Sequence, residues 1–282
     1  MDKPEVLGNL HYVPIVIFIT FPATVITTYS IAVGLGHTEA GFPYISDTTT
    51  YAPESCIFAQ FMNIAAALMS FFVYVRYEQV KECIVEFRGN DSLQKWNRAG
   101  LVFGLLTNLG LSIVANFQET SVLVVHMIGA FMCFGAGTIY FWSQAVCSYY
   151  LQPHGCSILV ARARIIMAIF MTICFIVTIV CGTLSFRLYK GKQVQKWYKD
   201  DGGWDLHIVS TIAEWLCSMT FCAYTLSFAE EFKNTQLVWP KLLIYKRDRN
   251  TTSNEVLSVY QEEERSVEGR VSSTRSEERT NS

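Results

Sequence analysis

Charged residues are scarce in this sequence. Of its 282 residues, 16% are Asp, Glu, Lys or Arg and 51% are hydrophobic, whereas an ordinary soluble domain carries about 25% charged residues. Five long stretches contain no Asp, Glu, Lys or Arg: Val13–Leu35, Cys56–Val75, Ala99–Gln118, Thr120–Leu151 and Ile165–Phe186. A sixth stretch, Leu206–Ala229, contains Glu214 as its one charged residue. Because about 20 apolar residues cross a bilayer as a helix, the composition excludes an ordinary soluble protein and predicts six membrane spans.

We therefore predict an all-α membrane protein, a bundle of six transmembrane helices. Within a transmembrane domain of residues 1–232, the expected spans are 13–35, 56–75, 99–117, 122–147, 165–186 and 206–228. Residues 233–282 are expected to form a cytosolic tail, disordered from about residue 250 because Ser, Thr, Glu and Arg dominate there. Of the 22 Lys and Arg residues, all but the five in residues 187–199 fall on the side of the chain ends. The positive-inside rule then places both termini in the cytosol.

Motifs that bind cofactors or activate nucleophiles are missing from the sequence. It has no His-x-x-x-His or Cys-x-x-Cys pair, no Gly-x-Ser-x-Gly elbow and no P-loop. We therefore expect no catalytic residues, no metal site, no cofactor and no binding of nucleic acid. Of the nine cysteines, only Cys56 falls at the outer boundary of a span, and one outer cysteine cannot build an internal disulfide framework.

Small and polar residues form a stripe along the third predicted span. They recur every four residues, at Gly100, Gly104, Asn108, Ser112 and Asn116. Helices in a bilayer associate through small residues and interhelical hydrogen bonds, so this stripe predicts a face that packs against neighbouring helices.

Glu214 lies inside the sixth predicted span, where an acidic residue at a helix centre costs roughly 2.5 to 3.5 kcal/mol. A glutamate side chain on a helix points toward the helix N-terminus, which here is the outer side. We therefore expect Glu214 to lie in a polar cluster with His126, His207 and Asn116 in the outer leaflet. The cluster has two interpretations, a structural hydrogen-bonded tie or a pH-sensitive switch, ion site or lipid-headgroup site. The structural tie is favoured, because such ties at single sites are common.

Several blocks resemble the damage-regulated autophagy modulator (DRAM) branch of the Frag/DRAM/Sfk family of six-span proteins. They are "PYISDTTTYAPESCIFAQFMNIAAAL", "AGLVFGLL", "GLSIVANFQ" and "HIVSTIAEW", in this order, and the resemblance runs from about Pro14 to Phe232. The matching positions supply a candidate outer-loop motif, namely Pro43, Tyr44, Asp47, Pro53, Glu54 and Cys56.

This resemblance implies a protein that is not an enzyme. It implies residence in lysosomes or related endomembranes and a role in promoting or modulating autophagy, through protein partners of the autophagy machinery or through membrane lipids. The resemblance supplies no catalytic residues.

Two alternatives remain open. One is a plasma-membrane scaffold that recruits a phosphoinositide kinase through residues 250–282 or affects lipid asymmetry. The other is a transporter or channel whose pathway is lined by the cluster around Glu214 and His126.

Overall fold

The computed structural model describes residues 6–87, 91–153 and 155–238. Within these residues, six helical segments are long and apolar enough to cross a membrane. The first three are α1 (Tyr12–Gly34), α2 (Glu54–Glu86) and α3 (Asp91–Asn116). The fourth, Leu123–Tyr150, joins α4 (Leu123–Phe131), the π-helical turn η2 (Met132–Ala136) and α5 (Gly137–Tyr150). The last two are α6 (Ile158–Leu188) and Trp204–Lys233, which joins α7 (Trp204–Leu226) to α8 (Ala229–Lys233).

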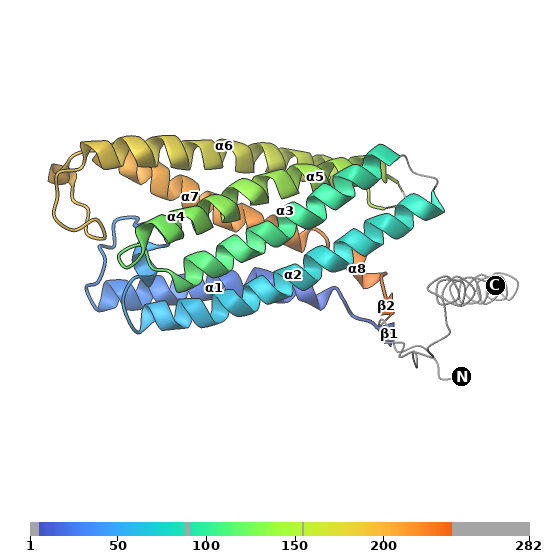
Figure 1. Ribbon diagram of the computed structural model, residues 1–282, viewed down its shortest axis with the longest axis horizontal. Coiled ribbons are helices and arrows are strands. Elements are labelled where there is room, and N and C mark those ends of the chain that lie inside the picture. Colours follow the sequence, from blue (N-terminus) through green and yellow to red (C-terminus); the bar gives the residue numbers. More distant parts are fainter. Residues whose placement is uncertain (1–5, 88–90, 154, 239–282) are drawn as a thin grey trace, which may run out of the picture. The chain divides into compact units, whose positions relative to one another are not determined.

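The predicted fold class, a membrane bundle of six helices, is confirmed. Helices that follow one another in sequence pack side by side, and α7 returns to pack against α1, so the six spans close into a ring (Figure 1). The predicted tail from about residue 250 lies outside the described residues.

Two short strands join the ends of the bundle. Strand β1 (Val6–Leu7) pairs antiparallel with β2 (Leu237–Val238), and Val6 lies opposite Val238. The residues at both ends of the described chain therefore lie at one end of the bundle, here called the inner end (Figure 1). The opposite end, which carries the α1–α2, α3–α4 and α6–α7 loops, is called the outer end. The placement of the inner end in the cytosol stays a prediction.

The second and third spans extend beyond the apolar runs that predict them. Helix α2 continues to Glu86 and α3 already starts at Asp91, whereas the sequence predicts that the second span ends at residue 75 and that the third starts at residue 99. No proline interrupts residues 76–86, so each backbone N–H keeps its helical partner as the helix leaves the apolar layer. At the tip of this extension Val80 and Leu93 are buried against Cys147 and Leu151.

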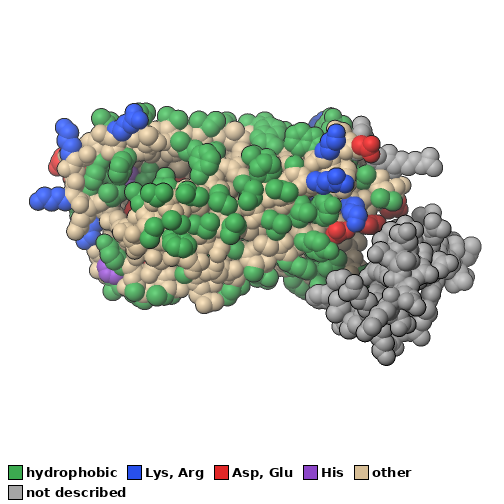
Figure 2. Space-filling view, in the orientation of Figure 1, with side chains coloured by type: hydrophobic (Ala, Val, Ile, Leu, Met, Phe, Trp, Pro, Cys, Tyr) green, Lys and Arg blue, Asp and Glu red, His purple; other side chains and the backbone are tan. Residues whose placement is uncertain are grey.

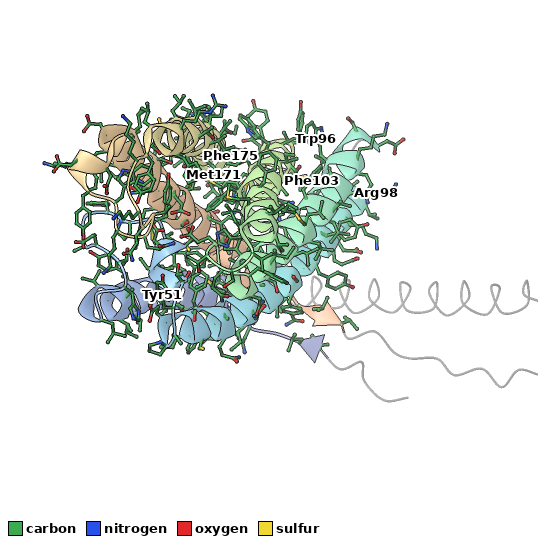
Figure 3. All side chains as sticks on the ribbon, turned by 60° about the vertical axis from the view of Figure 1, so that its left-hand side comes forward. Tyr51, Trp96, Arg98, Phe103, Met171 and Phe175 are labelled. Atoms are coloured by element: carbon green, nitrogen blue, oxygen red, sulfur yellow. The ribbon has the colours of Figure 1, made fainter. Side chains whose placement is uncertain are left out.

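Side chains sort by polarity along the bundle. In the face shown in Figure 2, Lys, Arg, Asp and Glu gather at the two ends, and the belt between them is dominated by hydrophobic and uncharged side chains. The main core lies inside this belt, where Met171 of α6 is fully buried and Phe103 and Phe175 pack against the same cluster (Figure 3). Near the inner end, Trp96 and Arg98 project outward from α3 (Figure 3).

One glycine turn positions the outer end of α7. Gly202 and Gly203 have φ angles of 83° and 69°, in the left-handed region that favours glycine. A Cβ atom on Gly202 would lie 2.5 Å from the carbonyl oxygen of Leu188, at the end of α6. The turn therefore holds the start of α7 directly against the end of α6, which fixes the height of Glu214 in the bundle.

Candidate functional site

The α1–α2 loop folds over the outer end of the bundle and closes it. We call residues 36–53 the outer cap. Most of its second half is buried: Ile45 is 6% exposed and Asp47 2%, and Thr48 is fully buried. The short 3-10 helix η1 (Asp47–Thr49) keeps this segment compact, because the Thr48 hydroxyl donates to the carbonyl of Ile45 at 2.7 Å.

Three hydrogen bonds attach the outer cap to α7. The backbone N–H of Ile45 donates to Oε2 of Glu214 at 2.8 Å, and the indole N–H of Trp215 donates to the carbonyl of Pro43 at 3.0 Å. One turn earlier on α7, Ser210 accepts a hydrogen bond from the hydroxyl of Tyr44 at 2.7 Å. Burial costs the carboxylate of Glu214 its hydration, and the Ile45 N–H replaces part of it.

The hydrogen bonds of Glu214 therefore differ from the predicted cluster. None of His126, His207 and Asn116 bonds to it. Asn116 exchanges hydrogen bonds with Asn63 of α2, both at 3.1 Å. The His207 ring stacks on Trp197 with ring centroids 4.2 Å apart. Glu214 accepts its hydrogen bond from the backbone N–H of Ile45 and not from the predicted side chains.

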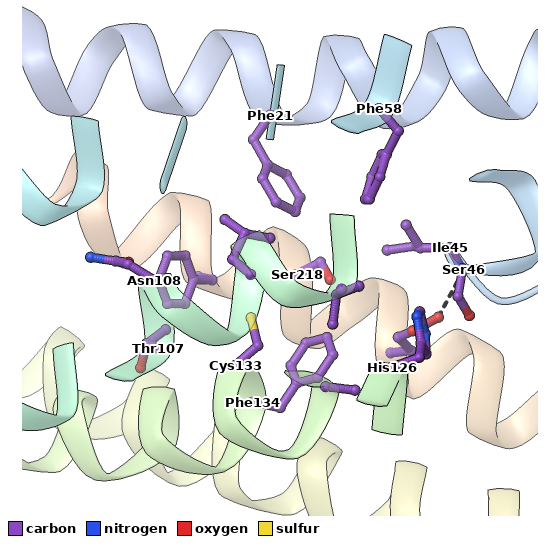
Figure 4. Close-up of a pocket in the computed structure, with 15 residues that line it drawn as sticks. Phe21, Ile45, Ser46, Phe58, Thr107, Asn108, His126, Cys133, Phe134 and Ser218 are labelled. Atoms are coloured by element: carbon purple, nitrogen blue, oxygen red, sulfur yellow. Dashed lines mark hydrogen bonds between the residues drawn. The ribbon is translucent and has the colours of Figure 1, made fainter. Parts of the chain in front are cut away.

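His126 nevertheless shares a cavity with Glu214. Its Nδ1 atom lies 2.7 Å from the carbonyl oxygen of Phe117, and since a carbonyl only accepts, Nδ1 carries the hydrogen. Nε2 makes no hydrogen bond to a described residue, and it keeps a lone pair in the uncharged tautomer of the ring. Both residues line a cavity of about 60 Å³ beneath the outer cap (Figure 4).

The cavity lies where α1, α2, α3, α7 and the fourth span converge. Ile45 of the outer cap forms its outer wall, and Cys133 and Phe134 of η2 lie across from Phe21 and Phe58 (Figure 4). A π-helical turn inside an α-helix is common at functional sites, because it displaces side chains from the regular helical positions. Such a turn directly at the cavity marks this part of the bundle as the candidate site.

The other members of the predicted outer-loop motif have separate contacts. Glu54, in the first turn of α2, is fully buried and its Oε1 lies 2.5 Å from Nδ1 of His37, while Oε2 has no hydrogen-bond partner among the described residues. Pro53 immediately precedes α2, and Cys56 is exposed on its first turn. Pro53 and Cys56 are therefore placed beside the site and do not form part of it.

Asp47 and Glu119 bring two carboxyl groups together at the outer end. Oδ2 of Asp47 accepts a hydrogen bond from the backbone N–H of Tyr44 at 3.0 Å. Oδ1 is buried and has no donor among the described residues, and the carboxyl group of Glu119 lies against it. Burial first, and the neighbouring Glu119 second, raise the pKa of Asp47 well above its usual range.

The stripe on α3 packs as a unit against α2 and α5. Asn108 donates to Ser70 of α2 at 3.2 Å, and Ser112 donates to Asn63 at 2.7 Å. Gly100 and Gly104 leave room for larger neighbours: a Cβ atom at Gly104 would lie 2.8 Å from Val73, and one at Gly100 would lie 2.6 Å from Gln144. This packing fixes the wall of the cavity that α3 provides.

An even closer contact between two helices could not be predicted from the spacing of small residues. A Cβ atom at Gly110 would lie 2.5 Å from the backbone nitrogen of Cys133 and 2.7 Å from the carbonyl oxygen of Gly129. The α3 backbone thus runs directly against the fourth span beside η2. Gly110 lies outside the four-residue repeat, so periodicity alone did not single it out.

A buried ion cluster at the inner end was not predicted from the sequence either. Glu231 of α8 bridges Arg76 of α2 at 2.7 Å and Arg164 of α6 at 2.5 Å. Both guanidinium groups also lie over the ring of Phe228, at 4.7 Å and 3.5 Å from its centroid. We call these four residues the inner clasp. Single charges at the ends of apolar runs look like membrane-surface residues in a sequence, and only the fold shows that Arg76 and Arg164 are buried.

The family follows from a comparison of the whole bundle. A family model described as the Frag1/DRAM/Sfk1/Cwh43P N-terminal domain matches residues 9–235. The chain belongs to this family. The match confirms the resemblance carried by the outer-loop and span motifs, and it covers nearly all of the described bundle.

Similar members of the family bear names that refer to autophagy. The chain is 38% identical to DNA damage-regulated autophagy modulator protein 2 of Bos taurus over 81% of this chain and 86% of the relative. It is 33% identical to DNA damage-regulated autophagy modulator protein 1 of Homo sapiens over 82% of this chain and 94% of the relative. It is 31% identical to the modulator of macroautophagy TMEM150B of Danio rerio over 76% and 80% of the two chains. No solved structure matches the chain.

Proposed function

We propose that this protein modulates autophagy from an endomembrane, the lysosome in particular, and that it promotes the process. The observation that carries the proposal is the similarity to relatives named as autophagy modulators, which extends over 81–82% of this chain for both DRAM proteins. The family model covers residues 9–235, which include the outer cap, the cavity and the inner clasp, so these features are available to an activity that the family shares.

The protein acts through binding partners, either proteins of the autophagy machinery or membrane lipids, and not through catalysis. The contacts of the polar groups support this view. The outer-cap carboxylate site is built from a backbone N–H, two hydroxyl groups and an indole N–H, all of which hold the cap to α7. Such contacts set the shape of a binding surface, and they leave Glu214 held to the backbone of the cap.

Autophagic flux in cells that lack the protein tests the proposal. Turnover of an autophagosome marker is measured with and without a lysosomal inhibitor, and the tagged protein is imaged against a lysosomal membrane marker. We expect reduced flux without the protein, restoration by the wild type, and coincidence with the lysosomal marker.

Two variants separate a local role of the cap from general loss of the protein. Glu214→Gln keeps the size of the side chain and removes its charge, and Glu230→Gln makes the same change at an exposed position of α8. Each is compared at equal abundance in the lysosomal membrane. Unchanged flux in the absence of the protein contradicts the proposal, and residence at the plasma membrane favours the lipid-kinase scaffold instead.

A further inference from the structure

The cavity beneath the outer cap combines an apolar wall with unused polar groups. Four phenylalanine rings line it, contributed by three different membrane spans and η2: Phe21, Phe58, Phe134 and Phe221 (Figure 4). An apolar wall of this kind suits a hydrocarbon stem and the face of a cation.

Three polar groups in the same wall have hydrogen-bonding capacity that the protein does not use. Glu214 makes one hydrogen bond, through Oε2 to the N–H of Ile45, so its Oε1 is free among the described residues. His126 uses Nδ1 for the carbonyl of Phe117, which leaves the lone pair of Nε2. Ser218 is 4% exposed and its hydroxyl makes no hydrogen bond to any described residue.

These groups favour a ligand that is rich in hydrogen-bond donors and positively charged. The carboxylate oxygen and the imidazole lone pair only accept, and the hydroxyl accepts as well as donates. A primary ammonium group carries three donors and one positive charge, which matches three acceptors and neutralises the carboxylate in an apolar setting. An anionic head would place two negative charges together in this setting, at a large cost. A neutral alcohol offers a single donor and leaves the charge unpaired.

The size of the cavity limits what fits inside it. A volume of about 60 Å³ holds more than one group of the size of water, each of which needs ~10–15 Å³ of such space. The ammonium group and its first carbons fit, but a long chain does not, so the rest of the molecule must leave through the side of the bundle.

We place this exit beside α4, on the side of the bundle that faces the bilayer. Helix α4 packs chiefly against α3, and its other side chains, Met127 and Phe131 among them, are exposed. Phe131 reaches Phe175 of α6, with ring centroids 5.8 Å apart. An apolar chain that leaves the cavity beside α4 enters the outer leaflet.

We propose that this cavity binds the head of a primary alkyl amine, with the ammonium group against Glu214, His126 and Ser218 and the alkyl chain in the outer leaflet. The site is a property of the bundle and does not depend on the role in autophagy, so a negative flux experiment leaves it unaffected.

Photolabelling of the full chain tests the site. The purified protein is reconstituted in phosphatidylcholine nanodiscs with a dodecylamine that carries a diazirine near the ammonium group, and labelled peptides are identified by mass spectrometry. We expect labels next to Phe21, Phe134 and Ser218. Unlabelled dodecylamine should compete about tenfold better than dodecan-1-ol or dodecyltrimethylammonium, since the alcohol lacks the charge and the quaternary amine lacks the N–H donors.

Variants of the cavity decide between a specific site and partition into lipid. Glu214→Gln removes the charge, and Ala130→Leu fills the wall without touching the polar groups. Each should lower competed labelling about tenfold, and the exposed Glu230→Gln should not. Where Glu214→Gln does not fold, as judged by size-exclusion chromatography, Ala130→Leu and Ser218→Ala carry the same test. Equal competition by the alcohol, labels only on the exposed side of α6, or wild-type labelling in the folded cavity variants overturns the proposal.

Discussion

At Asp47 of the outer cap, the surroundings in the folded protein disfavour the ionised form of the side chain. Its pKa is raised by burial and by Glu119. A carboxyl group with a raised pKa in the folded protein contributes stability that is present in full below its ordinary pKa of about 3.9 and is lost as the pH rises through the raised value. The outer cap is therefore most stable in acidic surroundings and least stable at neutral pH and above.

Replacing Asp47 with Asn should remove much of this dependence. The amide cannot ionise, its oxygen still accepts from the N–H of Tyr44, and its NH₂ group can donate to Glu119. We expect the midpoint of thermal unfolding of the wild type to decrease as the pH rises above the ordinary Asp pKa of about 3.9. The midpoint of Asp47→Asn should change less and should exceed that of the wild type at the higher pH. Asp200→Asn, on the exposed 3-10 turn of the same end, is the control. Parallel pH curves for wild type and Asp47→Asn would rule this explanation out.

At Gly110 the helix α3 and the fourth span are in direct backbone contact. At Gly110 the atoms that a side chain would meet belong to the backbone of Cys133 and Gly129, and backbone atoms cannot turn away as the end of a flexible side chain can. The same contact holds η2 at the cavity, so the shape of the candidate site depends on it.

Gly110→Ala should separate the two helices. Overpacking typically costs about 1–3 kcal/mol, and we expect at least this loss in SDS-induced unfolding of the purified protein. Gly34→Ala is the matched control, since nothing lies within 4 Å of a Cβ atom at that helical position. That change should alter stability by less than about 1 kcal/mol, in the favourable direction expected for alanine in a helix. Equal effects of the two substitutions would show that the close approach does not matter.

For the whole molecule, the inner clasp joins parts of the chain that are far apart in sequence. Glu231 shares its two carboxylate oxygens between Arg76 and Arg164, which lie 155 and 67 residues away from it. Both arginines are buried and Glu231 is 9% exposed. The clasp thus locks α2, α6 and α8 together at one end of the ring of helices.

Glu231→Gln should destabilise the entire bundle. It leaves two buried guanidinium groups without a counter-ion, and the removal of one partner from a buried ion pair costs about 3–5 kcal/mol. Glu230→Gln makes the same change next to it, at a side chain that is 82% exposed, and should have almost no effect. The midpoint of SDS-induced unfolding and the yield of monodisperse protein measure both. A Glu231→Gln protein as stable as Glu230→Gln would refute the role assigned to the clasp.

The features of this structure that could be predicted are those that depend on the type of the side chains and on their spacing in the sequence. The six apolar runs, of which one contains Glu214, predict the six spans because an apolar segment in the bilayer can satisfy its own backbone hydrogen bonds only as a helix. The residues from Gly100 to Ser112 share one face because the helix repeat places them there. The partner of Glu214 could not be predicted, because it is the backbone N–H of Ile45, 169 residues away. Every residue other than proline has such a group, so it leaves no trace in the sequence.

The burial of Arg76 and Arg164 was hidden for another reason. Each lies next to an apolar run, where a basic residue ordinarily extends into the lipid headgroups. Only the return of α8 beneath the bundle brings Glu231 within reach of both. The sequence thus specifies the elements, and the packing of the elements decides which charges meet.

The pairing of β1 with β2 sets where the described chain enters and leaves the bundle. Because Val6 lies opposite Val238, these two points are neighbours although they lie at the two ends of the described sequence. Labels attached to the two strands would therefore report on the same end of the bundle.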